Sequence, residues 1–371
     1  MKNFGFQRKE SAFCCNLFFT ILSLVLMVGG LLTGCGQNNA PSALAADTAS
    51  QNTSATSESY SMELFAMDTV MTLTAYGDSA QAAIEVSAAE IQRLEQLFST
   101  NLEDSDIARL NQDKQAQLPD EAISVLQKAV QLYQDTNGAF DITLYPIIKA
   151  WGFTTENYRI PTSEELQQFL QHTGIDCITL DVDIGMVQLT DAQTEIDLGG
   201  IVKGYASDRV IQQMASYGVQ SAVISLGGNV QTLGTKPDGS LWRVGIQDPD
   251  APDECIGVVE TANQAVITSG PYQRYFIGED GTRYHHIIDP QKGVPAESGL
   301  SSVTIVSDSG ILADGLSTAL FVMGAERALQ YWQQHRADFD TILITNDRQI
   351  IITAGLADCF QSEYDYYVFG E

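Results

Sequence analysis

The chain has 371 residues, enough to bury a large core, and hydrophobic residues make up 44% of it. Its 47 Asp and Glu residues outnumber 19 Lys and Arg residues, which gives a formal net charge of −28. A protein that binds nucleic acid needs a basic surface for its phosphate contacts. The composition therefore argues against nucleic acid as a partner.

The first 34 residues have the pattern of a secretory signal peptide. The basic segment MKNFGFQRKE precedes an apolar run over residues 17–32, which is short for a stable membrane span. The run leads into Leu32, Thr33, Gly34 and Cys35, which resemble the lipobox of bacterial lipoproteins. We expect residues 1–34 to be removed and Cys35 to carry diacylglycerol, with the mature protein on the outer side of the cell membrane. A plain signal peptide or a single anchor helix is the alternative.

Residues 35–60 are expected to be the lipidated cysteine and a disordered tether. Residues 36–60 are rich in Ser, Thr, Ala, Asn and Gln and show no hydrophobic periodicity, so they cannot bury enough apolar area to order themselves. Removal of the signal takes away a net charge of +2 and leaves −30. Besides Cys35, the mature chain keeps Cys177, Cys255 and Cys359, which indicates no disulfide framework, although one bridge is possible.

Residues 61–371 are expected to form one α+β domain, with two lobes of mixed sheet and helices around a cleft. A strand-like run covers residues 62–77. Apolar spacings of three and four predict a helix over residues 84–98 and another from residue 120 to near residue 138. Short β-rich runs at 221–228, 242–248, 301–307 and 341–347 alternate with helices expected after Asp208 and after Asp314.

The apolar segment ADGLSTALFVMG, residues 313–324, carries an acid and a hydroxyl four residues apart. Positions four apart lie on one face of an α-helix, so Asp314 and Thr318 would point toward the same spot. Two such oxygens could hold a cation. Asp is also a favoured helix N-cap, so this segment alone leaves both interpretations open.

Four further segments hold more glycine and polar residues than a helix or strand needs, namely 138–153, 195–210, 225–230 and 285–298. Each has an ordinary structural explanation, because Gly-Gly pairs and Asp-Pro make turns. Taken in chain order together with the motifs MDTVMTL, ITSGPYQRYF and DGLSTALFVMG, however, these segments resemble the ApbE family of FAD:protein FMN transferases. These bacterial enzymes attach FMN through its phosphate to a threonine of another protein. The resemblance covers residues 61–371. Each motif alone is weak evidence, but the occurrence of all of them in one order makes the resemblance strong.

The resemblance implies a reaction and a site. Transfer of FMN from FAD breaks a pyrophosphate and releases AMP, and Mg²⁺ suits this reaction because it prefers hard oxygen ligands and phosphates. The implied Mg²⁺ ligands are Asp314, Thr318 and the backbone carbonyl of Gly200. The residues implied to bind FAD are Met67, Ala139, Phe140, Asp141, Asp197 and Lys203, with Ile287 or Ile288. Glycines 199, 200, 227 and 228 would let backbone amides approach the phosphate or ring edges.

The acceptor hydroxyl needs a base, and the chain has four histidines. His286 lies in the HIIDP motif and has an ordinary pKa near neutrality, so we expect it to be the base, with a structural hydrogen bond as the alternative. His172 and His335 are expected on the surface. A cation in a glycine-rich motif of so acidic a chain favours Lys203 as a phosphate partner. Core packing is the alternative role for aromatic residues such as Trp151.

Asn101 departs from the family pattern. Many members carry there an aromatic residue that stacks on flavin or adenine, and its loss could weaken FAD retention or admit water. One alternative function is therefore an FAD diphosphatase that releases FMN and AMP. Another is a non-catalytic lipoprotein that binds flavin or another solute, which would need neither a metal nor a base. The resemblance implies an exported or membrane redox protein as acceptor.

Overall fold

The structure, a computed structural model, describes residues 6–9 and 58–370. The predictions for Cys35, for the tether up to residue 57 and for most of the signal peptide lie outside the described residues. Ser59 and Tyr60 already belong to strand β2 (Ser59–Ala66), so the folded part begins slightly earlier than expected. Within the described residues, no helix has the length and apolar character needed to span a membrane.

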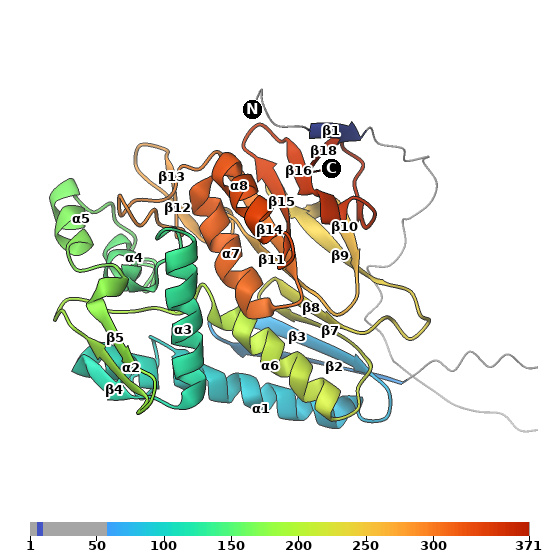
Figure 1. Ribbon diagram of the computed structural model, residues 1–371, viewed down its shortest axis with the longest axis horizontal. Helices are drawn as coiled ribbons and strands as arrows, with labels where there is room; N and C mark the ends of the chain where they lie inside the picture. Colours follow the sequence, from blue (N-terminus) through green and yellow to red (C-terminus); the bar gives the residue numbers. More distant parts are fainter. Residues whose placement is uncertain (1–5, 10–57, 371) are drawn as a thin grey trace, which may run out of the picture. The chain divides into compact units, whose positions relative to one another are not determined.

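A mixed sheet organises the domain (Figure 1). The order of its ten described strands is β1-β18-β16-β15-β14-β11-β8-β7-β3-β2, and of these neighbours only β16 and β18 run parallel. Besides β2, the strands are β1 (Phe6–Lys9), β3 (Thr69–Tyr76), β7 (Ser221–Leu226), β8 (Asn229–Leu233), β11 (Ala265–Ser269), β14 (Leu300–Ser307), β15 (Asp340–Thr345), β16 (Ile350–Thr353) and β18 (Tyr366–Phe369). The run at 62–77 is thus a hairpin, because Met67 and Asp68 have φ values of 50° and 58°, as a two-residue type I′ turn requires.

Helices cover one face of this sheet (Figure 1), and a small sheet covers part of the other. The covering helices are α1 (Ala80–Phe98), α6 (Val202–Ser216), α7 (Gly310–Met323) and α8 (Ala325–His335). The small sheet has the order β17-β10-β9, formed by β17 (Phe360–Gln361), β10 (Ala251–Thr261) and β9 (Trp242–Asp248). A second hydrophobic cluster fills the space between the two sheets. The domain is therefore α+β, as expected.

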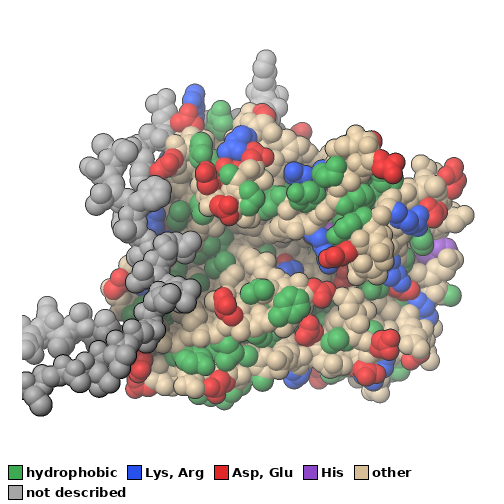
Figure 2. All heavy atoms as spheres, turned by 180° about the vertical axis from the view of Figure 1, so that it is seen from behind, with side chains coloured by type: hydrophobic (Ala, Val, Ile, Leu, Met, Phe, Trp, Pro, Cys, Tyr) green, Lys and Arg blue, Asp and Glu red, His purple; other side chains and the backbone are tan. Residues whose placement is uncertain are grey.

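The remaining elements lie outside these two sheets. They are α2 (Asp106–Asp113), α3 (Asp120–Asp135), α4 (Tyr145–Trp151), α5 (Ser163–Leu170), η1 (Ile142–Leu144), η2 (Ile175–Cys177), η3 (Ala354–Leu356), β4 (Gln115–Gln117), β5 (Ile178–Asp181), β6 (Met186–Leu189), β12 (Tyr275–Ile277) and β13 (Arg283–His285). Trp151 is buried in a small cluster of its own, and its Nε1 donates to the carbonyl of Gly293 at 2.8 Å, so its role is core packing. Cys177, Cys255 and Cys359 are free thiols. Acidic side chains are spread over the face seen in Figure 2, in keeping with the net charge.

Helices α6 and α7 begin earlier than predicted. The sequence placed them after Asp208 and Asp314, but both residues lie inside their helices. Gly204 and Gly310 lie near the N-termini of the two helices, and glycine is a poor helix former, so the sequence did not indicate a helix at these positions. The two glycines touch, since a Cβ on Gly204 would lie 2.1 Å from the carbonyl oxygen of Gly310. Without side chains there, the N-terminal parts of the two helices approach closely.

Each of these helices receives a carboxylate from the other at its N-terminus. The carboxylate of Asp208 in α6 accepts from the N–H groups of Gly310 and Ile311 in α7, at 2.7 and 2.9 Å. The carboxylate of Asp314 in α7 accepts from the N–H of Gly204 in α6, at 2.8 Å. Negative charge at these ends satisfies free N–H groups and complements the helix dipoles. The reciprocal capping fixes the position of Asp314 relative to α6.

Candidate functional site

Two adjoining cavities, of about 450 and 240 Å³, form a cleft within the domain. The larger lies among the tip of the β2–β3 hairpin, the end of α1 and the start of α4. The smaller lies among residues 139–148, the start of α6 and helix α7. The residues that line both cavities are Ile148, Asp197, Gly199, Lys203, Gly227, Gln273, Arg274 and His286. The two cavities therefore adjoin along these residues.

The cleft brings together the residues that the sequence placed in the site, except Gly228, which lines neither cavity. Met67 and Asn101 line the larger cavity. Asp197, Lys203 and His286 line both. The smaller cavity is lined by Ala139, Phe140, Asp141, Gly200, Ile287, Ile288, Asp314 and Thr318. Motifs distant in sequence thus converge on one space.

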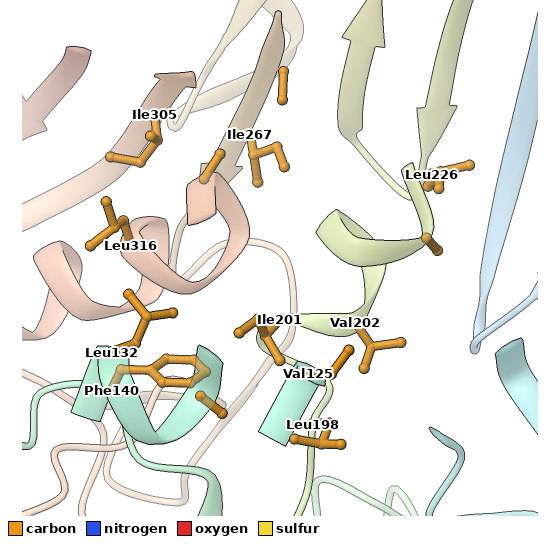
Figure 3. Packing of buried hydrophobic residues seen from close by; sticks show 14 of the residues in the cluster. Val125, Leu132, Phe140, Leu198, Ile201, Val202, Leu226, Ile267, Ile305 and Leu316 are labelled. Atoms are coloured by element: carbon orange, nitrogen blue, oxygen red, sulfur yellow. The ribbon is translucent and has the colours of Figure 1, made fainter. Parts of the chain in front are cut away.

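Two loops from different motifs meet at the wall of the smaller cavity. The N–H of Asp197 donates to the carbonyl of Ile142 at 2.8 Å and joins the second glycine-rich segment to the first. The ring of Phe140 packs beside Leu132 in the core (Figure 3) and also lines the cavity. A Cβ on Gly200 would lie 3.2 Å from this ring, so glycine keeps the loop close to the aromatic wall. Phe140 therefore serves both the core and the site.

Two partly buried carboxyl groups face the cleft. Burial raises the pKa of Asp141, while hydrogen bonds from the Thr143 N–H and hydroxyl, at 2.8 and 2.6 Å, oppose that shift. Burial also raises the pKa of Asp197, against the N–H of Gly199 at 2.9 Å and the positive charge of Lys203. Both side chains are held in place by these bonds.

The ring of His286 is held in one tautomer. Its Nδ1 lies 3.1 Å from the carbonyl oxygen of Arg274, which can only accept a hydrogen bond. Nδ1 of the neutral ring therefore carries the hydrogen, and Nε2 keeps its lone pair. Burial lowers the pKa of His286 to about 4, and the positive charges of Arg274 and Lys203 act in the same direction. The imidazole is thus neutral near pH 7, the state that accepts a proton.

Asp314 does not cap its own helix. The N-cap of α7 is Ser309, whose hydroxyl accepts from the N–H of Leu312. Asp314 lies one turn further on, with 4% of its surface exposed. Besides Gly204, its carboxylate accepts from the amide of Asn229 at 2.9 Å. Each oxygen retains a second lone pair, and no Lys or Arg of the described residues forms an ion pair with it.

The oxygens around Asp314 fit a hard divalent cation. Thr318 lines the same cavity one helical turn later, and a Cβ on Gly200 would lie 3.8 Å from its hydroxyl oxygen. The N–H of Gly204 donates to Asp314 and not to the carbonyl of Gly200 four residues earlier, so this bond leaves that carbonyl free. Carboxylate, hydroxyl and carbonyl oxygens are ligands that Mg²⁺ accepts. Asp314 is the one charged member of this set. In agreement, the described residues hold no cluster of three His, Cys, Asp or Glu side chains suited to a metal.

The other histidines do not line the cleft. His172, expected on the surface, is half-buried just after α5, and its Nδ1 lies 2.8 Å from the carboxylate of Asp191. His335 ends α8 and is half-buried against Tyr331, with ring centroids 4.2 Å apart. Both side chains keep partial exposure at the surface, 22% for His172 and 33% for His335, so each is covered only in part by these neighbours. His285 is buried against Phe321.

Several lining residues were not predicted. Gln273 and Arg274 line both cavities and lie in the motif ITSGPYQRYF. A signal for Arg274 existed, because it is a cation within a motif of an acidic chain, as Lys203 is. Glu95 had no such signal: its carboxylate accepts from the N–H of Met67 at 2.7 Å and ties α1 to the hairpin turn. Only the fold reveals that contact.

Asn101 lies exposed at the rim of the larger cavity. Its amide donates to the carboxylate of Asp68 in the hairpin turn at 2.8 Å. The position where the family pattern has an aromatic ring thus holds a polar side chain tied to its neighbour.

Comparison with known proteins places this arrangement among flavin transferases. The model of the ApbE family matches residues 67–343. An FAD:protein FMN transferase of Haemophilus influenzae is 32% identical over 285 residues, which cover 74% of this chain and 81% of that protein. The structure of the ApbE protein of Thermotoga maritima is 32% identical with a TM-score of 0.74, over 79% of this chain and 96% of that one. The structure of the flavin transferase ApbE from Vibrio cholerae is 27% identical with a TM-score of 0.71, over 84% and 97%.

Proposed function

The chain belongs to the ApbE family, and we propose that it transfers FMN from FAD to a threonine hydroxyl of an acceptor protein, with Mg²⁺ as cofactor. It is an enzyme, and FAD is its substrate. The new bond is a phosphoester between FMN and the acceptor, and AMP leaves. The observation that carries the proposal is the convergence of the neutral His286 and the Asp314 oxygen set on one cleft.

The cleft provides separate places for the two ends of FAD. We assign the smaller cavity, with Ala139, Phe140 and Asp141, and the larger cavity, with Met67 and Asn101, to opposite ends of the molecule. The diphosphate between those ends then lies where the cavities meet. Lys203, which lines both, supplies positive charge there. Ile287 and Ile288 add apolar wall to the smaller cavity.

His286 acts as the base. Its neutral ring accepts the proton of the acceptor hydroxyl at Nε2 while the hydroxyl oxygen bonds to the phosphorus of the FMN phosphate. The bond between that phosphorus and the oxygen of AMP breaks, and the electron pair leaves with AMP. The carbonyl of Arg274 keeps the other ring nitrogen protonated and so orients the ring throughout.

Asp314, Thr318 and the carbonyl of Gly200 would hold Mg²⁺. When bound there, the cation would neutralise negative charge on the diphosphate and on the leaving phosphate. The buried carboxylate without a basic partner supports this assignment, because it gives a cation the only formal negative charge in the set.

We further propose that the protein works outside the cell membrane. Residues 1–34 are the signal peptide, Cys35 carries the lipid, and residues 35–60 tether the domain that follows. The basic start, the apolar run and the small residues before Cys35 support this location. An exported or membrane redox protein is then the acceptor.

The test is direct flavinylation. The purified domain is incubated with FAD, Mg²⁺ and a candidate acceptor, and flavin fluorescence is sought on the denatured acceptor band, with AMP measured in parallel. Covalent fluorescence that requires a threonine of the acceptor supports the transferase. AMP and free FMN formed at the same rate without acceptor would identify a diphosphatase, which the polar Asn101 favours. Binding of FAD with neither product would identify a carrier.

A further inference from the structure

Arg274 differs from the other arginines in the contacts of its side chain. The sequence has eleven arginines, and all lie within residues 6–9 and 58–370. The side chains of ten of them form ion pairs, hydrogen bonds or cation–π contacts. The guanidinium of Arg274 forms none of these with the described residues. Its donors are therefore available to a ligand.

Arg274 also lies at the place where the two cavities join. Together with Lys203 it provides all the Lys and Arg side chains that line either cavity in the described part of the chain. Six acidic residues line the cavities, namely Asp68, Glu95, Asp141, Glu156, Asp197 and Asp314. Acidic side chains are also spread over the surface in Figure 2. An anion entering this cleft needs local positive charge.

The charge of Arg274 acts on the groups at the junction. It helps burial to lower the pKa of His286, and it opposes the rise that burial causes in the pKa of Asp197. Arg274 thus acts on groups that line both cavities, and it forms no ion pair with Asp197.

We propose that the guanidinium of Arg274, together with Lys203, binds the diphosphate of FAD at the junction of the two cavities. The inference rests on the proposed function, which makes FAD the substrate. The diphosphate carries two negative charges. The positive charges of Arg274 and Lys203 would offset them in a cleft that is also lined by six carboxyl groups. Arginine suits the position because its planar fork donates to two phosphate oxygens at once, whereas lysine offers a point charge.

The side chain can be tested apart from the backbone. In Arg274→Gln the carbonyl that orients His286 remains. Binding is measured by fluorescence titration with FAD and with riboflavin, which lacks phosphate, in EDTA so that turnover is suppressed. We expect Arg274→Gln to weaken FAD binding by about 10- to 100-fold, the range of a lost charged hydrogen bond, and to leave riboflavin binding unchanged. Arg274→Lys should fall between wild type and Arg274→Gln.

Arg283→Gln is the matched control. Arg283 lies on the neighbouring strand β13, lines neither cavity and lies over the ring of Tyr275 at 4.5 Å. The Arg283→Gln variant should bind FAD and riboflavin with the same affinities as the wild type. Unchanged FAD affinity in Arg274→Gln would overturn the proposal, and an equal loss for FAD and riboflavin would show a structural role instead. Failure of the wild type to bind FAD at all would contradict the proposed function itself.

Discussion

Burial prepares two residues of the cleft for opposite tasks. His286 loses its charge because its surroundings disfavour a cation, so it can take a proton at neutral pH. Asp314 is buried among hydrogen-bond donors and has no basic partner among the described residues, so it can attract a cation. Each role depends on the surroundings of the residue as much as on its identity.

Removal of His286 should slow the transfer reaction without abolishing FAD binding. For His286→Ala we expect a loss of about 10²–10⁴-fold in kcat, typical of a missing general base. His172→Ala, which changes a histidine outside the cleft, is the control and should keep the wild-type rate. Equal rates for wild type and His286→Ala would remove His286 from the mechanism.

The acid limb of the pH profile should lie far below the ordinary histidine range. Burial favours the neutral ring, so the base stays deprotonated as the pH falls through 6.5 and becomes protonated only near pH 4. We therefore expect kcat/KM, which reports on the free enzyme, to stay level from pH 7.5 to about pH 5 and then to fall. The measurement is kcat/KM against pH at constant ionic strength. An inflection near pH 6.5 would contradict the assignment of a buried, neutral His286 as the base.

Asp314→Asn should separate metal binding from capping. Asn caps helices about as well as Asp, so the loss of stability should be small, but the charge that favours Mg²⁺ is gone. We expect activity to fall and to recover in part at raised Mg²⁺, and Thr318→Val should show the same trend. Asp208→Asn is the matched control, because Asp208 caps α7 but lines neither cavity. The same Mg²⁺ dependence in wild type, Asp314→Asn and Thr318→Val would falsify the ligand assignment.

At the scale of elements, the pair α6 and α7 determines the geometry of the smaller cavity. Contact between Gly204 and Gly310 allows each helix to receive a carboxylate from the other. The same contact sets the distance between Asp314, on α7, and the loop of Gly200, which leads into α6. Packing of two helices thus places ligands that are far apart in sequence.

Gly204→Ala should disturb this pair. The added Cβ would lie 2.1 Å from the backbone of Gly310, and backbone cannot move aside as a side chain can. We expect the free energy of unfolding to fall by about 1–3 kcal/mol or more, measured by urea denaturation, with a parallel loss of activity. Ser216→Ala, at the exposed end of the same helix, should stay within about 0.5 kcal/mol of wild type. A wild-type midpoint in Gly204→Ala would show that the helices can separate freely.

At the scale of the whole molecule, Cys35 should determine where the enzyme resides. In Cys35→Ser the lipid cannot be attached, so we expect the precursor to stay unprocessed or the protein to leave the membrane fraction. Fractionation and the mass of the N-terminal peptide measure this, with Cys255→Ser as a control outside the lipobox. Mature, membrane-held Cys35→Ser protein would disprove lipidation at this residue.

Much of the site could be predicted from the sequence because its residues lie in short motifs with fixed internal spacing. Asp314 and Thr318 share a helix face whatever the rest of the chain does, since the helical period alone sets their spacing. Glycine pairs, the HIIDP motif and the amphipathic helices are local in the same sense. The α+β class and many residues of the cleft followed from these patterns, and the ordered motifs carried the resemblance to the family, whereas Gln273, Arg274 and Glu95 were not predicted.

Other properties arise only when distant segments pack together. The partners of Asp314 lie on α6 and at Asn229, and the low pKa of His286 comes from burial by several loops. Among the described residues the guanidinium of Arg274 has no ion pair, hydrogen bond or cation–π contact, and only the folded structure shows this. The sequence by itself determined which chemical groups are present and their spacing within each motif. Tertiary structure alone decided their burial, charge state and mutual contact, because these depend on residues far apart in the chain.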